Sequence, residues 1–371
     1  MAVPYWPDEL DAYEVLRAVE EAAARAGFTV LEASLSHGVP TLLVQPRRDV
    51  KRAFEDLMEL LMSLRIMPVL RRGPQGLIIR AVPMRAVKKG SSRVPLILFL
   101  ATLGTLFATG WLLSADLPEG PLVGALMYVG AMMAILATHE LGHWIAARLH
   151  GVTVTMPYFI PAPPPISIFG TFGAFIQQKT PAPNKDALFD IGVAGPLAGF
   201  VAAVAITLIG LPLSKIVVGP VRGITLPYIP AYALLARLVL GPLHSIAGEE
   251  VHITLHPIAF AGWTGMLVTM LNLIPAGSLD GGHIARCFLG PREQMALGVS
   301  ASLFIVFLSM AFPGLYGAWY MPMAFLALLM ALSYRHPGPL DDVSSLSGWR
   351  KLLALVPVVI FVLCLFPIPV P

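Results

Sequence analysis

Charged residues are scarce in this chain of 371 residues: Asp, Glu, Lys and Arg make up 13% of it. Ordinary soluble domains contain about 25% charged residues, so the composition argues against an ordinary soluble protein. Hydrophobic residues reach 56%, and several apolar runs have the ~20 residues that a membrane-spanning helix requires. The sequence therefore predicts a polytopic α-helical membrane protein that is embedded in a lipid bilayer.

Cysteine is also rare, with two residues, Cys287 and Cys364, each in an apolar stretch. Two distant thiols exclude a disulfide framework and a zinc site built from cysteines. The formal net charge is only +3, and the basic residues are scattered, so no nucleic-acid partner is expected. The N-terminus has acidic residues where a signal peptide would have basic ones, so we expect no cleaved targeting segment.

Residues 1–90 differ in composition from the rest of the chain. Amphipathic helices are expected within residues 8–27 and 50–64, the second with Phe54, Leu61 and Leu64 on its buried face, and two short strands follow each helix. This helix–strand–strand order, present twice, predicts a small soluble α+β domain. A transmembrane domain is expected over residues 91–371. Residues 1–90 carry no catalytic constellation, which favours a role in gating, partner recognition or substrate recognition, with a purely structural role as the alternative.

About six or seven transmembrane helices are expected. The apolar segments lie at roughly 94–113, 121–149, 186–212, 257–276, 293–313, 316–334 and 351–369. Segment 227–243 is short for a span, and we expect an interfacial or half-helix there. The stretch RAVKKGSSR, residues 85–93, is basic, whereas the loop SADLPEG, residues 114–120, is acidic. The positive-inside rule then puts residues 1–90 in the cytoplasm, and we expect the plasma membrane of a prokaryote.

Two histidines and a glutamate interrupt an apolar run in ILATHELGHWIAARL, residues 135–149. On a helix, His139 and His143 share a face and can bind one metal ion, while Glu140 reaches a water molecule held by that ion. This is the H-E-x-x-H arrangement of zinc peptidases, in which the glutamate is the general base. The alternative is a chance pentapeptide or a pair of structural histidines, but ionisable groups inside a span are costly and usually functional.

A catalytic zinc ion usually has three protein ligands, so a third is sought elsewhere. The stretch MLNLIPAGSLDGGH, residues 270–283, interrupts an apolar span and carries Asp280. A carboxylate and two imidazoles suit zinc, which makes Asp280 the preferred ligand; a turn-forming or helix-capping aspartate is the alternative. His283 is the nearest competitor. The other histidines are expected to be solvated or interfacial; they are His37, His150, His244, His252, His256 and His336.

HELGH in a transmembrane helix, followed far downstream by N-x-x-P-x-x-x-L-D-G, resembles the site-2 protease family of intramembrane metalloproteases. The second motif begins here at Asn272, and the likeness covers most of residues 94–334, including AGPLAG at 194–199. The resemblance implies zinc bound by His139, His143 and Asp280, with Glu140 activating the water. It also implies that Asn272 lies near the site, where it helps to orient or stabilise the reacting carbonyl. The AGPLAG segment is expected to pack tightly beside the metal-binding helix.

A substrate helix must unwind before its peptide bonds can be cleaved. Five prolines between Met156 and Pro165 exclude a regular helix there, and GTFGAFIQ, residues 170–177, suits an extended edge. We expect a re-entrant β-hairpin whose edge, formed by Gly170, Thr171, Phe172 and Gly173, receives the substrate as an added strand. A proline-rich connector is the alternative.

The predicted function is that of an intramembrane zinc metalloendopeptidase, which cleaves transmembrane protein substrates in or near their spans in regulated intramembrane proteolysis. A zinc or other divalent-metal transporter and a catalytically silent zinc-binding scaffold are the alternatives. A transporter would favour several weak sites along a path and repeated halves, whereas the sequence has one compact site and an intact Glu140. A protease of the prenylated-protein type would normally recruit a glutamate, not Asp280, as third ligand.

Overall fold

The computed structural model describes residues 11–84, 93–219, 225–241, 251–312, 315–333 and 335–366. The chain forms two compact units. The small unit comprises Met1–Lys89 together with Lys179–Leu188 and Gly338–Ser347, and the helical unit comprises Gly90–Gln178, Phe189–Pro337 and Gly348–Pro371. Most of the basic stretch used to predict the orientation, residues 85–92, lies outside the described residues, as does His244.

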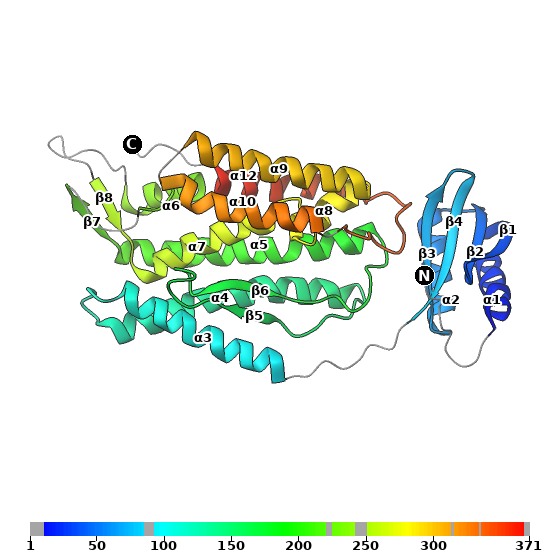
Figure 1. Cartoon of the computed structure of the whole chain (residues 1–371), viewed down its shortest axis with the longest axis horizontal. Coiled ribbons are helices and arrows are strands. Elements are labelled where there is room, and N and C mark those ends of the chain that lie inside the picture. Colours follow the sequence, from blue (N-terminus) through cyan, green and yellow to red (C-terminus); the bar gives the residue numbers. More distant parts are fainter. Residues whose placement is uncertain are drawn as a thin grey trace. The chain divides into compact units, whose positions relative to one another are not determined.

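The small unit is built on a four-stranded antiparallel sheet with two helices (Figure 1). In chain order its elements are α1 (Ala12–Arg25), β1 (Phe28–Ser36), β2 (Val39–Pro46), α2 (Val50–Met62), β3 (Ile66–Gly73) and β4 (Gly76–Pro83). The order is helix–strand–strand, twice. Because the strands are arranged β1-β2-β4-β3, β1 and β3 are the edge strands. Asp49 caps α2 by accepting a hydrogen bond from the backbone N–H of Arg52.

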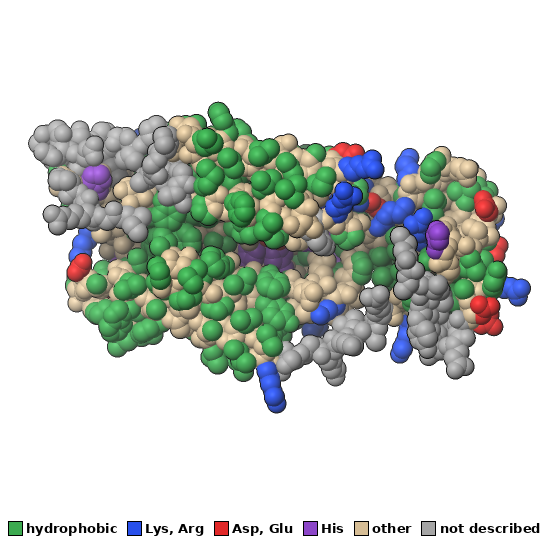
Figure 2. Space-filling view, in the orientation of Figure 1, with side chains coloured by type: hydrophobic (Ala, Val, Ile, Leu, Met, Phe, Trp, Pro, Cys, Tyr) green, Lys and Arg blue, Asp and Glu red, His purple; other side chains and the backbone are tan. Residues whose placement is uncertain are grey.

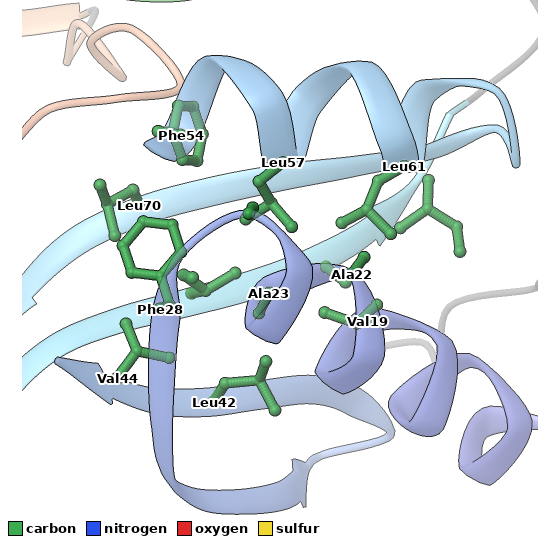
Figure 3. Close-up of a cluster of buried hydrophobic side chains, with 14 of the residues drawn as sticks. Val19, Ala22, Ala23, Phe28, Leu42, Val44, Phe54, Leu57, Leu61 and Leu70 are labelled. Carbon is green, nitrogen blue, oxygen red and sulfur yellow. The ribbon is translucent and has the colours of Figure 1, made fainter. Parts of the chain in front are cut away.

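The hydrophobic core of the small unit is formed by the apolar faces of α1 and α2 together with side chains of the sheet (Figure 3). Val19 of α1, and Phe54 and Leu61 of α2, are at most 1% exposed, as their helical spacing predicts. Leu64, which we expected on the same face as Phe54 and Leu61, is 51% exposed. That prediction is wrong because α2 ends at Met62 and Arg65 turns the chain with a φ of 57°.

Two segments from later in the chain extend the sheet of the small unit beyond β3. Residues 340–342 run parallel to β3: the N–H of Leu70 donates to the carbonyl of Leu340 at 2.9 Å, and the N–H of Asp342 donates to the carbonyl of Leu70 at 3.3 Å. Residues 182–184 pair in the same way with residues 340–341, through two hydrogen bonds of 2.9 Å. The side chain of Leu340 is part of the hydrophobic core of the small unit. These segments therefore belong to its fold.

Long apolar helices make up most of the helical unit (Figure 1). Five described helical stretches are long and apolar enough to cross a membrane: α3 (Arg93–Leu113), α4 (Pro121–Leu149), α5 (Lys185–Gly210) with the 3-10 turn that follows it, α9 (Pro291–Ala311), and the consecutive helices α11 (Gly348–Leu353) and α12 (Leu355–Leu365). Many large apolar side chains on their outer faces are exposed, as lipid contact requires. The chain is a polytopic helical membrane protein.

Other expected spans appear as shorter helices. Of the 16 residues of α7 (Pro257–Asn272), 12 are buried, including Trp263 and Met266, so α7 is a central helix of this unit. α10 (Leu315–Ser333) contains Pro322, and α6 (Pro230–Leu240), within the short segment 227–243, has only 11 residues. The count of six or seven spans stays a prediction.

A β-hairpin follows α4. β5 (Tyr158–Pro161) pairs antiparallel with β6 (Thr171–Phe175). The hairpin packs on α3, where the rings of Phe99 and Phe159 meet edge to face at 5.4 Å between centroids. It also packs on α4, where the hydroxyl of Tyr128 donates to the carbonyl of Phe169 at 2.8 Å. A second short pair, β7 (Lys215–Val218) and β8 (Val251–Thr254), lies later in the chain.

Candidate metal centre

The two histidines of the HELGH stretch lie one turn apart on α4, as their spacing requires. Their Nε2 atoms are 3.1 Å apart, and their rings meet at an interplanar angle of 72°. His139 is 7% exposed and His143 is 6% exposed. Histidine side chains are visible in the middle of the otherwise apolar surface of the helical unit (Figure 2).

Asp280 meets both histidines. The chain leaves the helical conformation after α7 and resumes it in α8 (Asp280–Phe288), so Asp280 is the first residue of α8 and not its N-cap, which is Leu279. Its two carboxylate oxygens lie 3.3 Å from Nε2 of His139 and 3.2 Å from Nε2 of His143. Within the described part of the chain, these are the three metal-capable side chains whose ligand atoms converge, all within 4.8 Å of one another.

Glu140 is buried beside this cluster, with an exposed fraction of 3%. Its Oε2 atom is inaccessible to solvent and has no hydrogen-bond partner among the described residues. A buried carboxylate oxygen without a partner is energetically costly. Its position therefore fits a site that receives a polar ligand, such as a water molecule near a bound cation.

A backbone carbonyl of α5 orients the imidazole of His143. The Nδ1 atom of His143 is 2.7 Å from the carbonyl oxygen of Ile191, so Nδ1 donates to that carbonyl and Nε2 faces Asp280. Backbone carbonyls commonly orient metal-binding histidines in this way. The role of Ile191 could not be predicted from the sequence, because a backbone acceptor leaves no signal in residue type.

The AGPLAG segment of α5 packs directly against the two histidines, as we expected. A Cβ atom built on Gly195 would lie 2.1 Å from Nε2 of His143, and one on Gly199 would lie 2.9 Å from Nδ1 of His139. A side chain at Gly195 would therefore occupy the space of the imidazole. Glycine at this position permits the close approach of α5 and α4 at the centre.

Asn272, the last residue of α7, also reaches the cluster. Its Nδ2 atom is 3.4 Å from Nε2 of His139, close to the atoms that converge with Asp280. The resemblance implies that Asn272 lies near the site, and its side-chain amide lies at the edge of the cluster.

His283 is not part of the converging group and pairs with another histidine. Its Nδ1 atom is 2.6 Å from Nε2 of His336, and the rings are perpendicular, with centroids 4.6 Å apart. Burial lowers the pKa of His336 far below its usual value, and the neighbouring His283 and Arg286 lower it further, so this side chain is neutral near pH 7.

We expected the remaining histidines to be solvated or interfacial, but His256 and His336 are buried, each 4% exposed. His256 caps α7 by accepting a hydrogen bond from the backbone N–H of Ile258, and His336 packs against His283. His150 is also engaged, at 2.8 Å from the carboxylate of Asp190. No local sequence pattern connects residues 283 and 336, so their contact could not be anticipated.

The four residues proposed as a substrate edge differ in their surroundings. Gly170 lies against the backbone of α3, and its carbonyl accepts a hydrogen bond from the Thr105 hydroxyl at 2.6 Å. The Thr171 side chain is buried, and its hydroxyl donates to the carbonyl of Ile160 at 2.8 Å. Phe172 is 62% exposed, and Gly173 has open space where a side chain would point. Phe172 is thus the one exposed residue of the four, because Gly173 is itself buried and its N–H donates to the Thr171 hydroxyl at 3.0 Å.

Comparison with known proteins identifies a family model and several relatives that match this chain. The model of peptidase family M50 matches residues 127–313. The probable zinc metalloprotease EGY1, chloroplastic, of Arabidopsis thaliana is 32% identical over 249 residues, which are 66% of this chain and 43% of that protein. The probable zinc metalloprotease EGY2, chloroplastic, of Oryza sativa subsp. indica is 33% identical over 175 residues, 45% of this chain and 30% of that protein.

The chain spans less than half the length of these relatives, and no solved structure matches it. The residues matched by the family model include the HELGH stretch, the AGPLAG segment and Asp280. The resemblance stated from the two motifs is therefore confirmed: the chain belongs to peptidase family M50, the family of the site-2 proteases.

Proposed function

We propose that this protein is an intramembrane zinc metalloendopeptidase that hydrolyses peptide bonds in or near the transmembrane segments of membrane proteins. The observation that carries the proposal is the convergence of His139, His143 and Asp280 inside an apolar helical unit, with the buried carboxylate of Glu140 beside them. The relatives named zinc metalloproteases support the same activity.

The proposed zinc ligands are the Nε2 atoms of His139 and His143 and the carboxylate of Asp280. Two imidazoles and one carboxylate form a donor set that zinc accepts, and three protein ligands leave a position open for chemistry. A bound Zn²⁺ polarises the scissile carbonyl and makes a water molecule more acidic. The bond from His143 to Ile191 supports this assignment, because it directs the Nε2 lone pair of His143 toward the other two ligands.

Glu140 is the proposed general base. Its carboxylate takes the proton of the attacking water and afterwards delivers that proton to the leaving amine. Asn272 is proposed to donate from its amide to the oxygen of the scissile carbonyl as negative charge develops there. Loss of one such donor commonly costs about 2.7–4 kcal/mol of transition-state stabilisation.

The β5–β6 hairpin is the proposed substrate-binding element, re-entrant between the long helices. β5 pairs with one side of β6, and the other side of β6 has no partner strand among the described elements. An unwound substrate segment can add to such an edge by main-chain hydrogen bonds. The exposed side chain of Phe172 supports this edge as the accessible one.

Replacing Phe172 with proline is expected to reduce cleavage about tenfold and to leave zinc content unchanged. Proline removes the backbone N–H that would donate to the substrate, a loss of about 1 kcal/mol or more in the bound state. Phe172→Ala is the matched control, because it removes the ring and keeps the N–H. Cleavage of a single-span substrate at the wild-type rate by Phe172→Pro would contradict strand addition.

Metal removal tests the proposed function itself. Purified full-length protein in lipid vesicles is expected to carry zinc and to cleave a co-reconstituted single-span protein. A chelator should remove both the zinc and the activity, and added zinc should restore them. If metal analysis shows that the zinc has been removed and cleavage still continues, the proposal is contradicted. Zinc uptake into the vesicles without cleavage would favour the transporter.

The proposed location is the plasma membrane of a prokaryote, with a domain of residues 1–90 in the cytoplasm and the metalloprotease domain in residues 91–371. Arg93 at the start of α3, opposite the acidic residues Asp116 and Glu119 after it, supports this orientation. The relatives are named chloroplastic, so a plastid membrane is the alternative. In oriented vesicles, resistance of residues 1–90 to protease on the cytoplasmic side would contradict this orientation.

A further inference from the structure

Asp186 joins three parts of the small unit. Its carboxylate accepts hydrogen bonds from the ammonium group of Lys51 on α2 at 2.5 Å and from the backbone N–H of Ser347 at 2.9 Å. It also accepts one from the Ser347 hydroxyl. Asp186 is only 6% exposed, so these charged contacts are shielded from water. They add to the backbone pairing of residues 340–342 with β3 and of residues 182–184 with residues 340–341.

The first of these segments continues directly into the part of α5 that contacts His143. The segment ends at Leu188, three residues before Ile191, whose carbonyl holds Nδ1 of His143. Gly195, one turn later, lies against the same imidazole. A single helix, α5, therefore connects Asp186 to the residues that orient His143.

The second segment leads to Asp280. It begins at Gly338, two residues after His336, which contacts His283 at 2.6 Å. His283 lies one turn after Asp280 on α8. The first connection runs through α5 to His143, and the second runs through His336 and His283 to Asp280. They come into contact at Gly192 of α5, where a Cβ atom would lie 2.9 Å from Cβ of His283.

We infer that the small unit is a regulatory domain of the protease, and that His336 is a positioning residue through which it acts on Asp280. The small unit holds the start of α5 and the segment after His336 in one arrangement. A ligand, a partner or a substitution that changes this arrangement moves α5, which holds His143, relative to α8, which carries Asp280. The consequence is a change in zinc retention and cleavage. This inference rests on the proposed function of the same site.

Zinc release from the full-length protein to an excess of chelator tests the inference. Asp186→Ala and His336→Ala are each expected to release zinc at least about tenfold faster than wild type, since loss of groups that support metal ligands typically costs 10–100-fold in affinity. His336→Gln keeps an amide able to hydrogen-bond to His283 and is expected to restore most of the slow release. Arg17→Met, at an exposed site on α1, is the control and should match wild type.

Protease resistance of the small unit verifies that Asp186→Ala folds. If it does not fold, Lys51→Met takes its place, because it preserves the Ser347 contacts; it is expected to accelerate release less. The double variant Asp186→Ala/His336→Ala should release zinc more slowly than the product of the single effects, because the two residues act on α5 and α8, which are in contact at Gly192 and His283.

A folded Asp186→Ala protein that releases zinc at the rate of Arg17→Met would overturn the inference and leave the proposed function intact. If the effects of the two substitutions on the zinc-release rate simply multiply in the double variant, the inference is also overturned, because Asp186 and His336 would then act independently. A wild-type protein that binds no zinc would instead overturn the proposed function.

Discussion

Replacing Glu140 with glutamine should abolish cleavage while zinc stays bound. Glutamine is nearly the same size as glutamate and fills the same buried space, but it cannot take a proton from water. General acid–base groups typically contribute 10²–10⁴-fold to a rate, so we expect kcat to fall by about 10³-fold. Cleavage of a reconstituted single-span substrate, measured beside zinc content, checks this expectation.

The matched control for Glu140→Gln is Glu119→Gln, the same chemical change in the exposed loop between α3 and α4, which should cleave as wild type does. A Glu140→Gln protein with full zinc content and wild-type activity would show that another group is the base. A protein that has lost zinc as well would indicate that Glu140 supports metal binding, for which its unpartnered Oε2 atom provides no structural reason.

Adding one methyl group at Gly195 should prevent normal metal binding. The Cβ atom of alanine would lie 2.1 Å from Nε2 of His143, well inside van der Waals contact, so either the imidazole or α5 must move. We expect zinc affinity to fall by 10–100-fold or more and activity to fall with it. Alanine favours a helix by about 1 kcal/mol over glycine, so lost helix propensity cannot be the cause.

Two other glycines make this a graded test. Gly199→Ala would put a Cβ atom 2.9 Å from Nδ1 of His139, and Gly130→Ala, on the same helix as the histidines, has no atom within 4 Å of the new group. Zinc affinity measured by chelator competition should therefore decrease from Gly130→Ala through Gly199→Ala to Gly195→Ala. Wild-type affinity in Gly195→Ala would contradict the close packing of α5 against the centre.

Local patterns in the sequence predicted much of this molecule. Apolar runs of about 20 residues predict membrane-spanning helices because the bilayer thickness sets their length, and α3, α4, α5 and α9 lie where those runs are. The contact of His139 with His143 follows from the helix period alone. Asp280 was selected because a polar residue at a break in an apolar run needs a reason to be there.

Other predictions are wrong because a local sequence pattern carries no information about the path of the backbone. Leu64 continues the apolar spacing of α2, yet it is exposed because the helix ends before it. His336, at the end of an expected span, was predicted to be solvated or interfacial, yet it is buried against His283. In both cases the deciding factor is the path of the backbone, which residue type specifies only weakly.

The class of protein, the family and the residue types of the centre follow from the amino-acid sequence, because hydrophobic length and helical spacing are properties of neighbouring residues. Three features required the folded chain: Asp280 reaches both imidazoles, α5 packs on them through Gly195, and residues 182–184 and 340–342 complete the sheet of the small unit. Those contacts join segments far apart in the chain, and the last of them use backbone groups, which are the same in nearly every residue.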